Sequence, residues 1–183
     1  LFLYPEALKL IDESLLVGAH DLQALTVKAY ILRRLGKKEE AAEVIRTIRS
    51  IDPLDYMSEF EESFLDRGDA SFFSVTRKNR SEGLIAVQEL LEVAANYITL
   101  GDTQAVRIML DEAVKIGAPY ANYPLIHLYM AYTLLDENKS EAMAEIERAS
   151  MLPAYNNFPL RIEELPVFEA LIRLRPDDPY LHY

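Results

Sequence analysis

The stretch 22–54 carries small, glycine and proline residues at the spacing of two antiparallel helices. Ala29 and Ala41 fall on the faces where two such helices would meet, and their small side chains allow close packing. Gly36 lies where the first helix would end, because glycine readily adopts the left-handed conformation that closes a helix. Pro53 stops the second helix, since proline lacks an N–H group. The stretch therefore predicts an α-helical hairpin, and no other pattern constrains the fold as much.

The same offsets recur on both sides of this hairpin. Moving back by about 34 residues, the length of a tetratricopeptide (TPR) repeat, brings Ala7 and Ile11 to the places of Ala41 and Ile45. Residues 5–17 are therefore predicted to be the second helix of a half-repeat. A second full unit repeats the offsets further along the chain, at Val87, Ala94, Tyr97, Gly101, Val106, Leu110 and Ala113.

A third unit is predicted over 124–153, where the glycine turn is replaced by Asp-Glu-Asn. Its Asn138 is expected to be a left-handed cap, because asparagine is the commonest substitute for glycine there. A last helix is predicted over 162–174, and residues 180–183 are expected to begin a truncated further helix.

One loop and one irregular segment complete the pattern. The loop 120–125 (YANYPL) recurs 35 residues later as 155–160 (YNNFPL), and each places proline at the start of a helix. By contrast, 65 residues separate Gly36 from Gly101, which is not a whole number of periods of about 34 residues. The segment 54–86 is therefore a non-standard insertion, for which short helices are predicted at 54–66 and 69–80.

Together these patterns predict an all-α fold. We expect a TPR-like right-handed α-solenoid of antiparallel helix pairs, with a non-standard helical insertion around 54–86. No strand-like alternation of apolar and polar residues competes with this interpretation. We expect a single domain over 1–183, cut from a longer chain, with half-repeats at both ends.

The acidic net charge of the chain disfavours partners that carry phosphate groups. The chain has 30 acidic and 19 basic side chains, a formal charge of −11 and a pI near 4.8. Such a field repels phosphate groups, so we expect no nucleic-acid partner and no membrane binding. No uninterrupted apolar run reaches the ~18–20 residues of a membrane-spanning helix. Cysteine is absent, which excludes disulfides and thiolate metal sites but does not fix the compartment.

The sequence contains no constellation of groups that catalysis would need. Its three histidines, far apart and without metal-ligand spacing, are His20, His127 and His182. Neighbouring glutamates are typical of a solvated helix face; such pairs are Glu61 with Glu62 and Glu163 with Glu164. A nucleophile elbow, a P-loop and a dinucleotide fingerprint are all missing. We predict no catalytic residue, no metal and no cofactor in this chain, although a longer parent protein would be free to be an enzyme.

Binding is better supported, because the first helices of a helical-repeat stack line a concave surface used for ligands. In the first full unit this surface is predicted to carry Tyr30, Arg33 and Arg34. One aromatic ring and two guanidinium groups would suit a partner that bears carboxylates. Alternatively, both arginines only favour the helix C-terminus electrostatically, by about 0.3–1 kcal/mol. The Lys and Asn of the carboxylate clamp in chaperone-binding TPR domains are missing from these positions.

The corresponding face of the third unit is more apolar and is formed by Leu125, Leu128, Tyr132 and Leu135. Because so large an exposed apolar area is unusual, we expect 54–86 or further parts of the parent protein to cover it. Tyr132 is a candidate binding residue on this face. Tyr155, in the second aromatic loop, and Arg161, just after it, are further candidates. The aromatic loops would present stacking surfaces for sugars or peptides, or would pack as staples between repeats.

Several segments together resemble a known group of proteins. They are IDPLDY (51–56) with EFE (59–61), YPLIH (123–127), NFPLR (157–161) and RPDDPY (175–180). The chain resembles the C-terminal helical-repeat region of large bacterial proteins whose N-terminal domain is a β-sandwich similar to carbohydrate-active enzymes. The resemblance implies a parent protein concerned with carbohydrate, in which this region docks on the sandwich domain, holds an oligomer together or frames a sugar site.

These observations support two functions of different classes. The first is a non-catalytic interaction scaffold that binds a peptide, a partner subunit or the N-terminal domain of its own parent protein, or that forms a homo-oligomer. The alternative is an accessory region of a multidomain carbohydrate-processing enzyme, to which Tyr155 and Arg161 would contribute sugar contacts. A purely structural spacer is a third possibility and predicts no binding at all.

Overall fold

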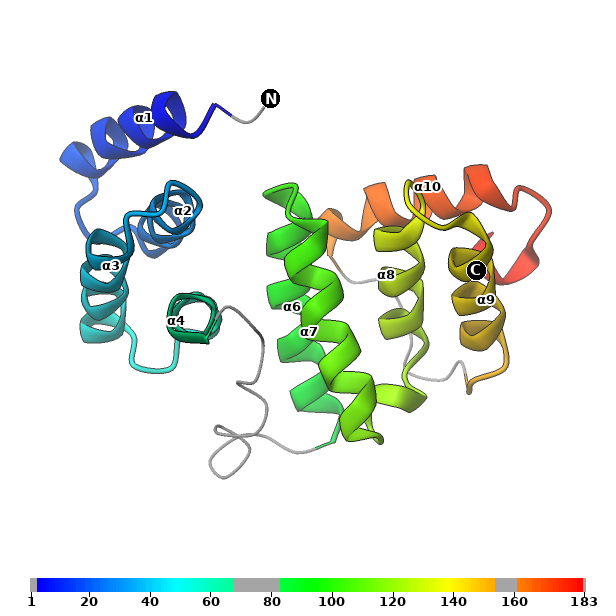
Figure 1. The fold of residues 1–183 in the computed structure, drawn as a ribbon. Helices are drawn as coiled ribbons and strands as arrows, with labels where there is room; N and C mark the ends of the chain where they lie inside the picture. Colours follow the sequence, from blue (N-terminus) through cyan, green and yellow to red (C-terminus); the bar gives the residue numbers. More distant parts are fainter. Residues whose placement is uncertain (1–2, 68–82, 154–160, 183) are drawn as a thin grey trace. The chain divides into compact units, whose positions relative to one another are not determined.

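The computed structural model describes residues 3–67, 83–153 and 161–182. The described residues form helices joined by turns, and no strand occurs among them (Figure 1). The predicted all-α fold class is therefore confirmed. The chain divides into two compact units, Leu1–Ser74 and Val75–Tyr183, and each is described here by itself. The single-domain organisation expected over 1–183 stays a prediction.

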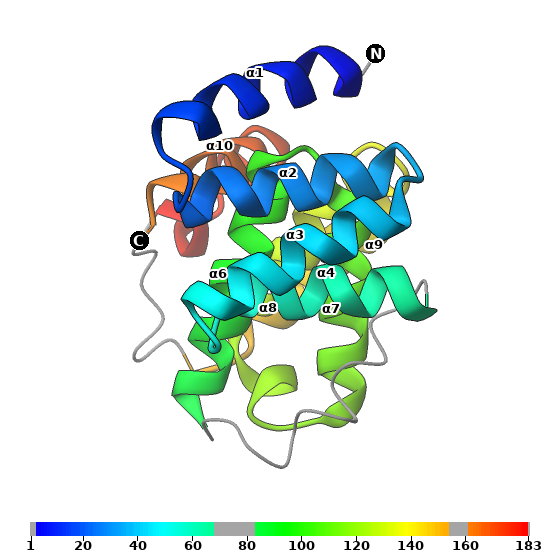
Figure 2. The same cartoon turned by 90° about the vertical axis from the view of Figure 1, so that its left-hand side faces the viewer.

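The first unit contains α1 (Tyr4–Val17), α2 (Leu22–Arg34), α3 (Lys38–Ile51) and α4 (Tyr56–Arg67). Helix α2 packs against each of the other three, and α1 lies on the opposite side of α2 from α4 (Figures 1 and 2). The side chain of Asp21 caps α2, as an acceptor for the Ala24 N–H at 3.1 Å. The helix predicted at 54–66 corresponds to α4, whereas the one predicted at 69–80 lies outside the described residues.

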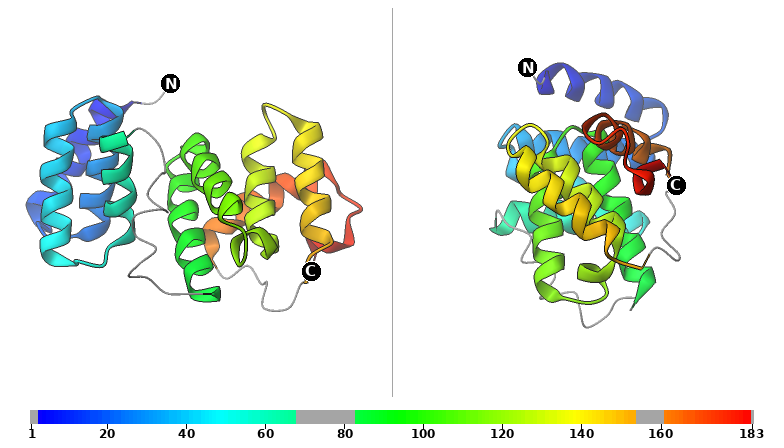
Figure 3. Two further views of the ribbon diagram at one scale, coloured as in Figure 1. Left: turned by 60° about the horizontal axis from the view of Figure 1, so that its bottom comes forward. Right: turned by 90° about the vertical axis from the view of Figure 1, so that its right-hand side faces the viewer.

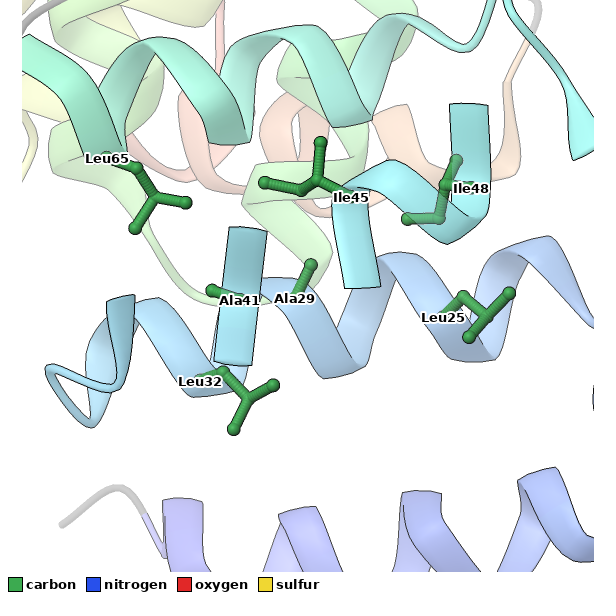
Figure 4. Packing of buried hydrophobic residues seen from close by; sticks show 7 residues of the cluster. All are labelled: Leu25, Ala29, Leu32, Ala41, Ile45, Ile48 and Leu65. Carbon is green, nitrogen blue, oxygen red and sulfur yellow. The ribbon is translucent and has the colours of Figure 1, made fainter. Parts of the chain in front are cut away.

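The core of the first unit lies between α2, α3 and α4. Its buried residues are Leu25, Ala29, Leu32, Ala41, Ile45, Ile48 and Leu65 (Figure 4). Ala29 and Ala41 have no exposed surface, so the predicted small residues do lie inside the hairpin. Close packing there depends on their size, because interhelical distance follows the side chains at the contact.

We expect leucine at position 29 or 41 to lower the free energy of unfolding by about 1–3 kcal/mol, because a full core tolerates added methylenes poorly. Urea unfolding followed by circular dichroism measures this change. Ala144, an exposed alanine of α9 (Lys139–Ser150), provides the matched control, Ala144→Leu. If all three leucine variants unfolded alike, the packing assigned to the α2–α3 hairpin would be wrong.

The turn between α2 and α3 closes as the glycine pattern predicts. Gly36 has φ +76°, a left-handed conformation that glycine adopts without steric cost. Its N–H donates to the Arg33 carbonyl, and the Lys37 N–H donates to the Leu32 carbonyl, both at 2.9 Å. This pair of bonds is a Schellman motif, which satisfies carbonyl groups that the helix end leaves unpaired.

The second unit begins with α6 (Leu84–Thr99) and α7 (Thr103–Ile116). Gly101 joins them with φ +75° and the same bonding as Gly36. Its N–H donates to the Ile98 carbonyl and the Asp102 N–H to the Tyr97 carbonyl, again both at 2.9 Å. The Asp102 side chain then caps α7 by accepting from the Ala105 N–H.

The rest of the second unit comprises η1 (Tyr120–Asn122), α8 (Pro124–Leu134), α9 (Lys139–Ser150), η2 (Ile162–Glu164), α10 (Leu165–Leu174) and η3 (Pro179–His182). Figure 3 shows α8 (yellow-green) and α9 (gold) side by side. The helix predicted over 162–174 is present as the short 3-10 turn η2 followed directly by α10. The residues expected to begin a truncated helix near the C-terminus form the 3-10 turn η3.

Helix α8 is buried because it packs against α7, α9 and α10. Leu125 and Leu128 are each only 1% exposed, while Tyr132 and Leu135 are half-buried. Helices of the second unit itself thus supply the cover that was expected from 54–86 or from the parent protein. The apolar periodicity of 124–135 did not reveal that α10 covers α8, because α10 begins 31 residues after α8 ends.

The turn between α8 and α9 differs from its prediction. Asn138 is not a left-handed cap: its φ is −149°, and it is the N-cap residue of α9, where its side-chain oxygen accepts from the Glu141 N–H. The same short polar side chain suits either end of a helix, so the sequence alone points equally to both.

Candidate functional site

The predicted binding residues of α2 lie in a cluster of arginine and aromatic side chains in the first unit. Arg33 makes a bidentate ion pair with Glu61 of α4, with Nε to Oε2 at 2.7 Å and a terminal nitrogen to Oε1 at 3.1 Å. Glu61 is fully buried. The Arg33 guanidinium carbon lies 4.8 Å from the centre of the Phe64 ring and 5.4 Å from that of Tyr30. Arg33 therefore ties α2 to α4.

Tyr30 and Arg34 complete this cluster on the α1 side. The Tyr30 ring is 2% exposed and packs edge to face with Tyr4 of α1, with ring centres 6.1 Å apart. The two hydroxyl oxygens are 3.3 Å apart. Arg34 is exposed, and its guanidinium carbon lies 5.7 Å from the centre of the Tyr4 ring. Of the three α2 candidates, Arg34 alone presents its side chain mainly to solvent, and the binding role of all three stays a prediction.

Arg161 belongs to a polar network in the second unit. Through one terminal nitrogen it pairs with Glu164 at 3.2 Å, and through the other it donates to the backbone and side-chain oxygens of Gln88, both at 3.0 Å. The buried Glu164 also accepts from the Tyr129 hydroxyl at 2.9 Å and from the Arg161 backbone N–H at 3.0 Å. Gln88 in turn donates to the Tyr123 hydroxyl at 2.7 Å. The network connects α6, α8 and η2.

Burial sets the ionisation of the tyrosines in this network. It raises the pKa of Tyr129 far above the ordinary value near 10, and the negative charge of Glu164 raises that pKa further. Burial also raises the pKa of Tyr123, although the hydrogen bond from Gln88 and the charge of Arg161 oppose the rise. Both hydroxyl groups therefore stay protonated in the folded chain when an exposed tyrosine would ionise.

This difference predicts loss of stability in alkaline solution. Below pH of about 10 Tyr129 is protonated in both the folded and the unfolded chain, so its contribution does not vary with pH. Above that pH the unfolded chain releases the proton and the folded chain keeps it, so the free energy of unfolding falls by about 1.4 kcal/mol per pH unit. Urea unfolding between about pH 8 and pH 11 should show a shallower fall for Tyr129→Phe. An unchanged slope would contradict the assigned burial.

His127 lies in a second polar cluster, on another side of α8. Its Nδ1 is 2.7 Å from Oε2 of Glu145, and its Nε2 is 2.9 Å from the Ala121 carbonyl oxygen. Arg148 donates to the other oxygen of Glu145 at 2.6 Å. His127 is 1% exposed, so it is a satisfied buried histidine that connects η1, α8 and α9.

The six candidate binding residues are divided between the two units, and one of them lies outside the described residues. Tyr30, Arg33 and Arg34 form one cluster in the first unit, whereas Tyr132 and Arg161 belong to the second. Tyr155 lies outside the described residues, as does the second aromatic loop. The glutamates were interpreted wrongly in two cases: Glu61 and Glu164 are buried partners of arginines and not part of a solvated face. For Glu164 the three-residue spacing from Arg161 was a usable signal.

The described part of the chain contains neither a candidate metal site nor a candidate membrane span. Within 3–67, 83–153 and 161–182, His, Asp and Glu residues form no group of three that could hold a metal ion. No helix in the same ranges has the length and apolar character required to cross a membrane. The comparisons with known proteins add nothing to this picture, since no family model, no curated protein and no solved structure matches the chain.

Proposed function

We propose that this chain is a non-catalytic interaction scaffold of the TPR type, in which helix hairpins stack as an α-solenoid and bind a protein or peptide partner. Helical-repeat proteins use the surfaces of stacked hairpins for recognition, and each hairpin needs its neighbours to bury its apolar faces. Within this proposal the chain supplies binding surfaces and not reacting groups.

The observation that carries the proposal is the equivalence of two hairpins 65 residues apart. Ala29 and Ala94 are both fully buried in the first helix of their hairpins, and Gly36 and Gly101 end those helices with the same backbone conformation. In the second helices, further pairs of equivalent buried residues are Ala41 and Val106, Ile45 and Leu110, and Ile48 and Ala113. One hairpin design used twice is what a repeat architecture requires.

The buried charges also support a scaffold. The three carboxylates of Glu61, Glu145 and Glu164 are each buried and each paired with an arginine. Removing one member of such a pair is costly because it leaves a buried charge without its partner. The pairs thus favour fixed helix positions, and a binding surface made of several helices depends on such rigidity.

Equilibrium binding to two panels tests the proposal. One panel contains immobilised helical and extended peptides, and the other contains oligosaccharides. The proposal predicts saturable binding to a subset of peptides and no saturable binding to any sugar. Saturable sugar binding without peptide binding would favour the accessory carbohydrate role instead. If neither peptides nor oligosaccharides showed saturable binding, only the structural-spacer function would remain.

A further inference from the structure

His127 of α8 places both of its ring nitrogens against oxygen atoms that accept hydrogen bonds. Nδ1 lies 2.7 Å from a carboxylate oxygen of Glu145 in α9, and Nε2 lies 2.9 Å from the backbone carbonyl oxygen of Ala121 in η1. A neutral imidazole has a single N–H, and its other nitrogen can only accept. If Glu145 is ionised, two hydrogen bonds at these distances therefore require a proton on each nitrogen of His127.

The contacts of Glu145 indicate that it is ionised. Its Oε1 accepts a hydrogen bond from Arg148 at 2.6 Å, and a positive charge so close favours the carboxylate over the neutral acid. A carboxylate that accepts from an imidazolium also forms a charge-assisted hydrogen bond, which is stronger than a bond between neutral groups. The shared proton therefore belongs on His127, which becomes an imidazolium cation in a site where it is only 1% exposed.

The charged groups on the neighbouring helices favour a cation at this position. On α7, Asp111 lies within electrostatic range of Glu141 and Glu145 of α9. Within α8 and η1 the other titratable side chains are tyrosines. With ion pairs counted as neutral, Asp111 and Glu141 leave an excess of negative charge, which favours the protonated histidine. The remaining charged residues of α7, α9 and α10 are Arg107 (paired with Glu137), Lys115 (paired with Glu112), Arg173 (paired with Glu169) and the exposed Lys139 and Glu147.

We propose that His127 is an imidazolium cation in the folded chain and acts as a pH-sensitive latch, in which its second proton holds η1 against α8. The 3-10 turn η1 lies in the connection between α7 and α8 (Figure 1). The latch therefore closes the junction between the α6–α7 and α8–α9 hairpins. It is a regulatory device that goes beyond the proposed scaffold function.

Loss of the second proton opens the latch on the η1 side. The proton that remains stays on Nδ1, because the bond to the carboxylate is the stronger of the two. The lone pair of Nε2 then faces the Ala121 carbonyl oxygen, and two acceptors cannot form a hydrogen bond. Opening thus releases a proton above about pH 6.5, where a histidine without partners is neutral, and becomes more favourable as the pH rises.

Nitrogen-15 NMR of the full chain labelled at histidine tests the protonation directly. At a pH at which the exposed His20 is neutral, we expect both ring nitrogens of His127 to carry protons. A single protonated nitrogen under these conditions would overturn the proposal. So would a proton on Glu145, which the carbon-13 chemical shift of its carboxyl group reports.

A nearly isosteric variant, Glu145→Gln, makes the second proton unnecessary. A glutamine side chain there can donate to Nδ1 and still accept from Arg148, so that a neutral His127 donates to Ala121 through Nε2. We expect His127 to be neutral in this variant at the pH used for the wild-type measurement. Glu141→Gln is the control, since Glu141 is exposed on the same helix, and it should leave His127 charged. Neutral His127 in both variants would assign the proton to the general charge of α9 and overturn the latch.

Amide hydrogen exchange measures the release of η1. The Tyr123 N–H donates to the Tyr120 carbonyl at 3.1 Å. Above about pH 6.5 its protection factor should fall by up to about tenfold per pH unit, because opening releases one proton. The Gly36 N–H closes a turn without histidine and should keep a constant protection factor. An unchanged protection factor of Tyr123 in the wild type, or an equal fall in Glu145→Gln, would overturn the proposal.

Discussion

Replacing Glu61 with alanine is expected to lower the free energy of unfolding of the first unit by about 3–5 kcal/mol. The substitution leaves the Arg33 guanidinium, 15% exposed, without the carboxylate that pairs with it through two contacts. Desolvation of the arginine then remains, while the attraction of this carboxylate is lost. Amide hydrogen exchange in α2 and α4 measures the loss of stability next to the ion pair, and urea unfolding measures it for the whole chain.

The next residue supplies the control for this experiment. Glu62 forms a surface ion pair with Arg49 at 2.7 Å, and both side chains are substantially exposed. Glu62→Ala should therefore cost no more than about 1 kcal/mol. Replacing Arg33 and Glu61 together by methionine and leucine should recover much of the loss, because both buried charges are then removed. If Glu61→Ala and Glu62→Ala were equally mild, the burial of the Arg33–Glu61 pair would be wrong.

Arg161→Ala is expected to have a comparable effect in the second unit, again about 3–5 kcal/mol. It leaves the Glu164 carboxylate, which is 1% exposed, without its cation, and it also frees Gln88 from two hydrogen bonds. Arg161→Lys should restore only part of the stability, because a single ammonium cannot reproduce the fork that reaches Glu164 and Gln88 at once. Urea unfolding of both variants measures these differences.

Arg173 provides the matched control, since it is exposed and pairs with Glu169 on the surface of α10. Arg173→Ala should change the free energy of unfolding by less than about 1 kcal/mol. If Arg161→Ala lowered the free energy of unfolding as little as Arg173→Ala, the polar network around Arg161 would not be what holds α6, α8 and η2 together. The prediction also bears on any sugar-binding assay of Arg161 variants: lost binding accompanied by unfolding would say nothing about a sugar contact.

The hairpins were predictable because their signals are local. The spacing of Ala29, Gly36 and Ala41 depends on contacts between neighbouring helices joined by a short turn, and the Asp21 cap depends on an N–H three residues away. Such patterns remain visible in a single sequence.

The Arg33–Glu61 ion pair and the hydrogen bonds of Arg161 to Gln88 were not predictable in the same way. Glu61 is 28 residues from Arg33, and Arg161 is 73 residues from Gln88. A glutamate beside other glutamates is usually solvated, and nothing local distinguishes the one that faces a distant arginine. The burial of Tyr30 has the same origin, since it depends on Tyr4 of α1 and on Arg33. Tertiary contacts, which helical periodicity does not encode, decided these positions.

Amide chemical-shift mapping tests the scaffold account most directly. In this measurement the labelled chain is titrated with a peptide that binds in the panel described above. The account predicts saturable shifts at exposed helix residues. It also predicts unchanged hydrogen exchange at the buried pairs of Arg33 and Arg161. Saturable shifts produced by an oligosaccharide, with none produced by any peptide, would contradict it.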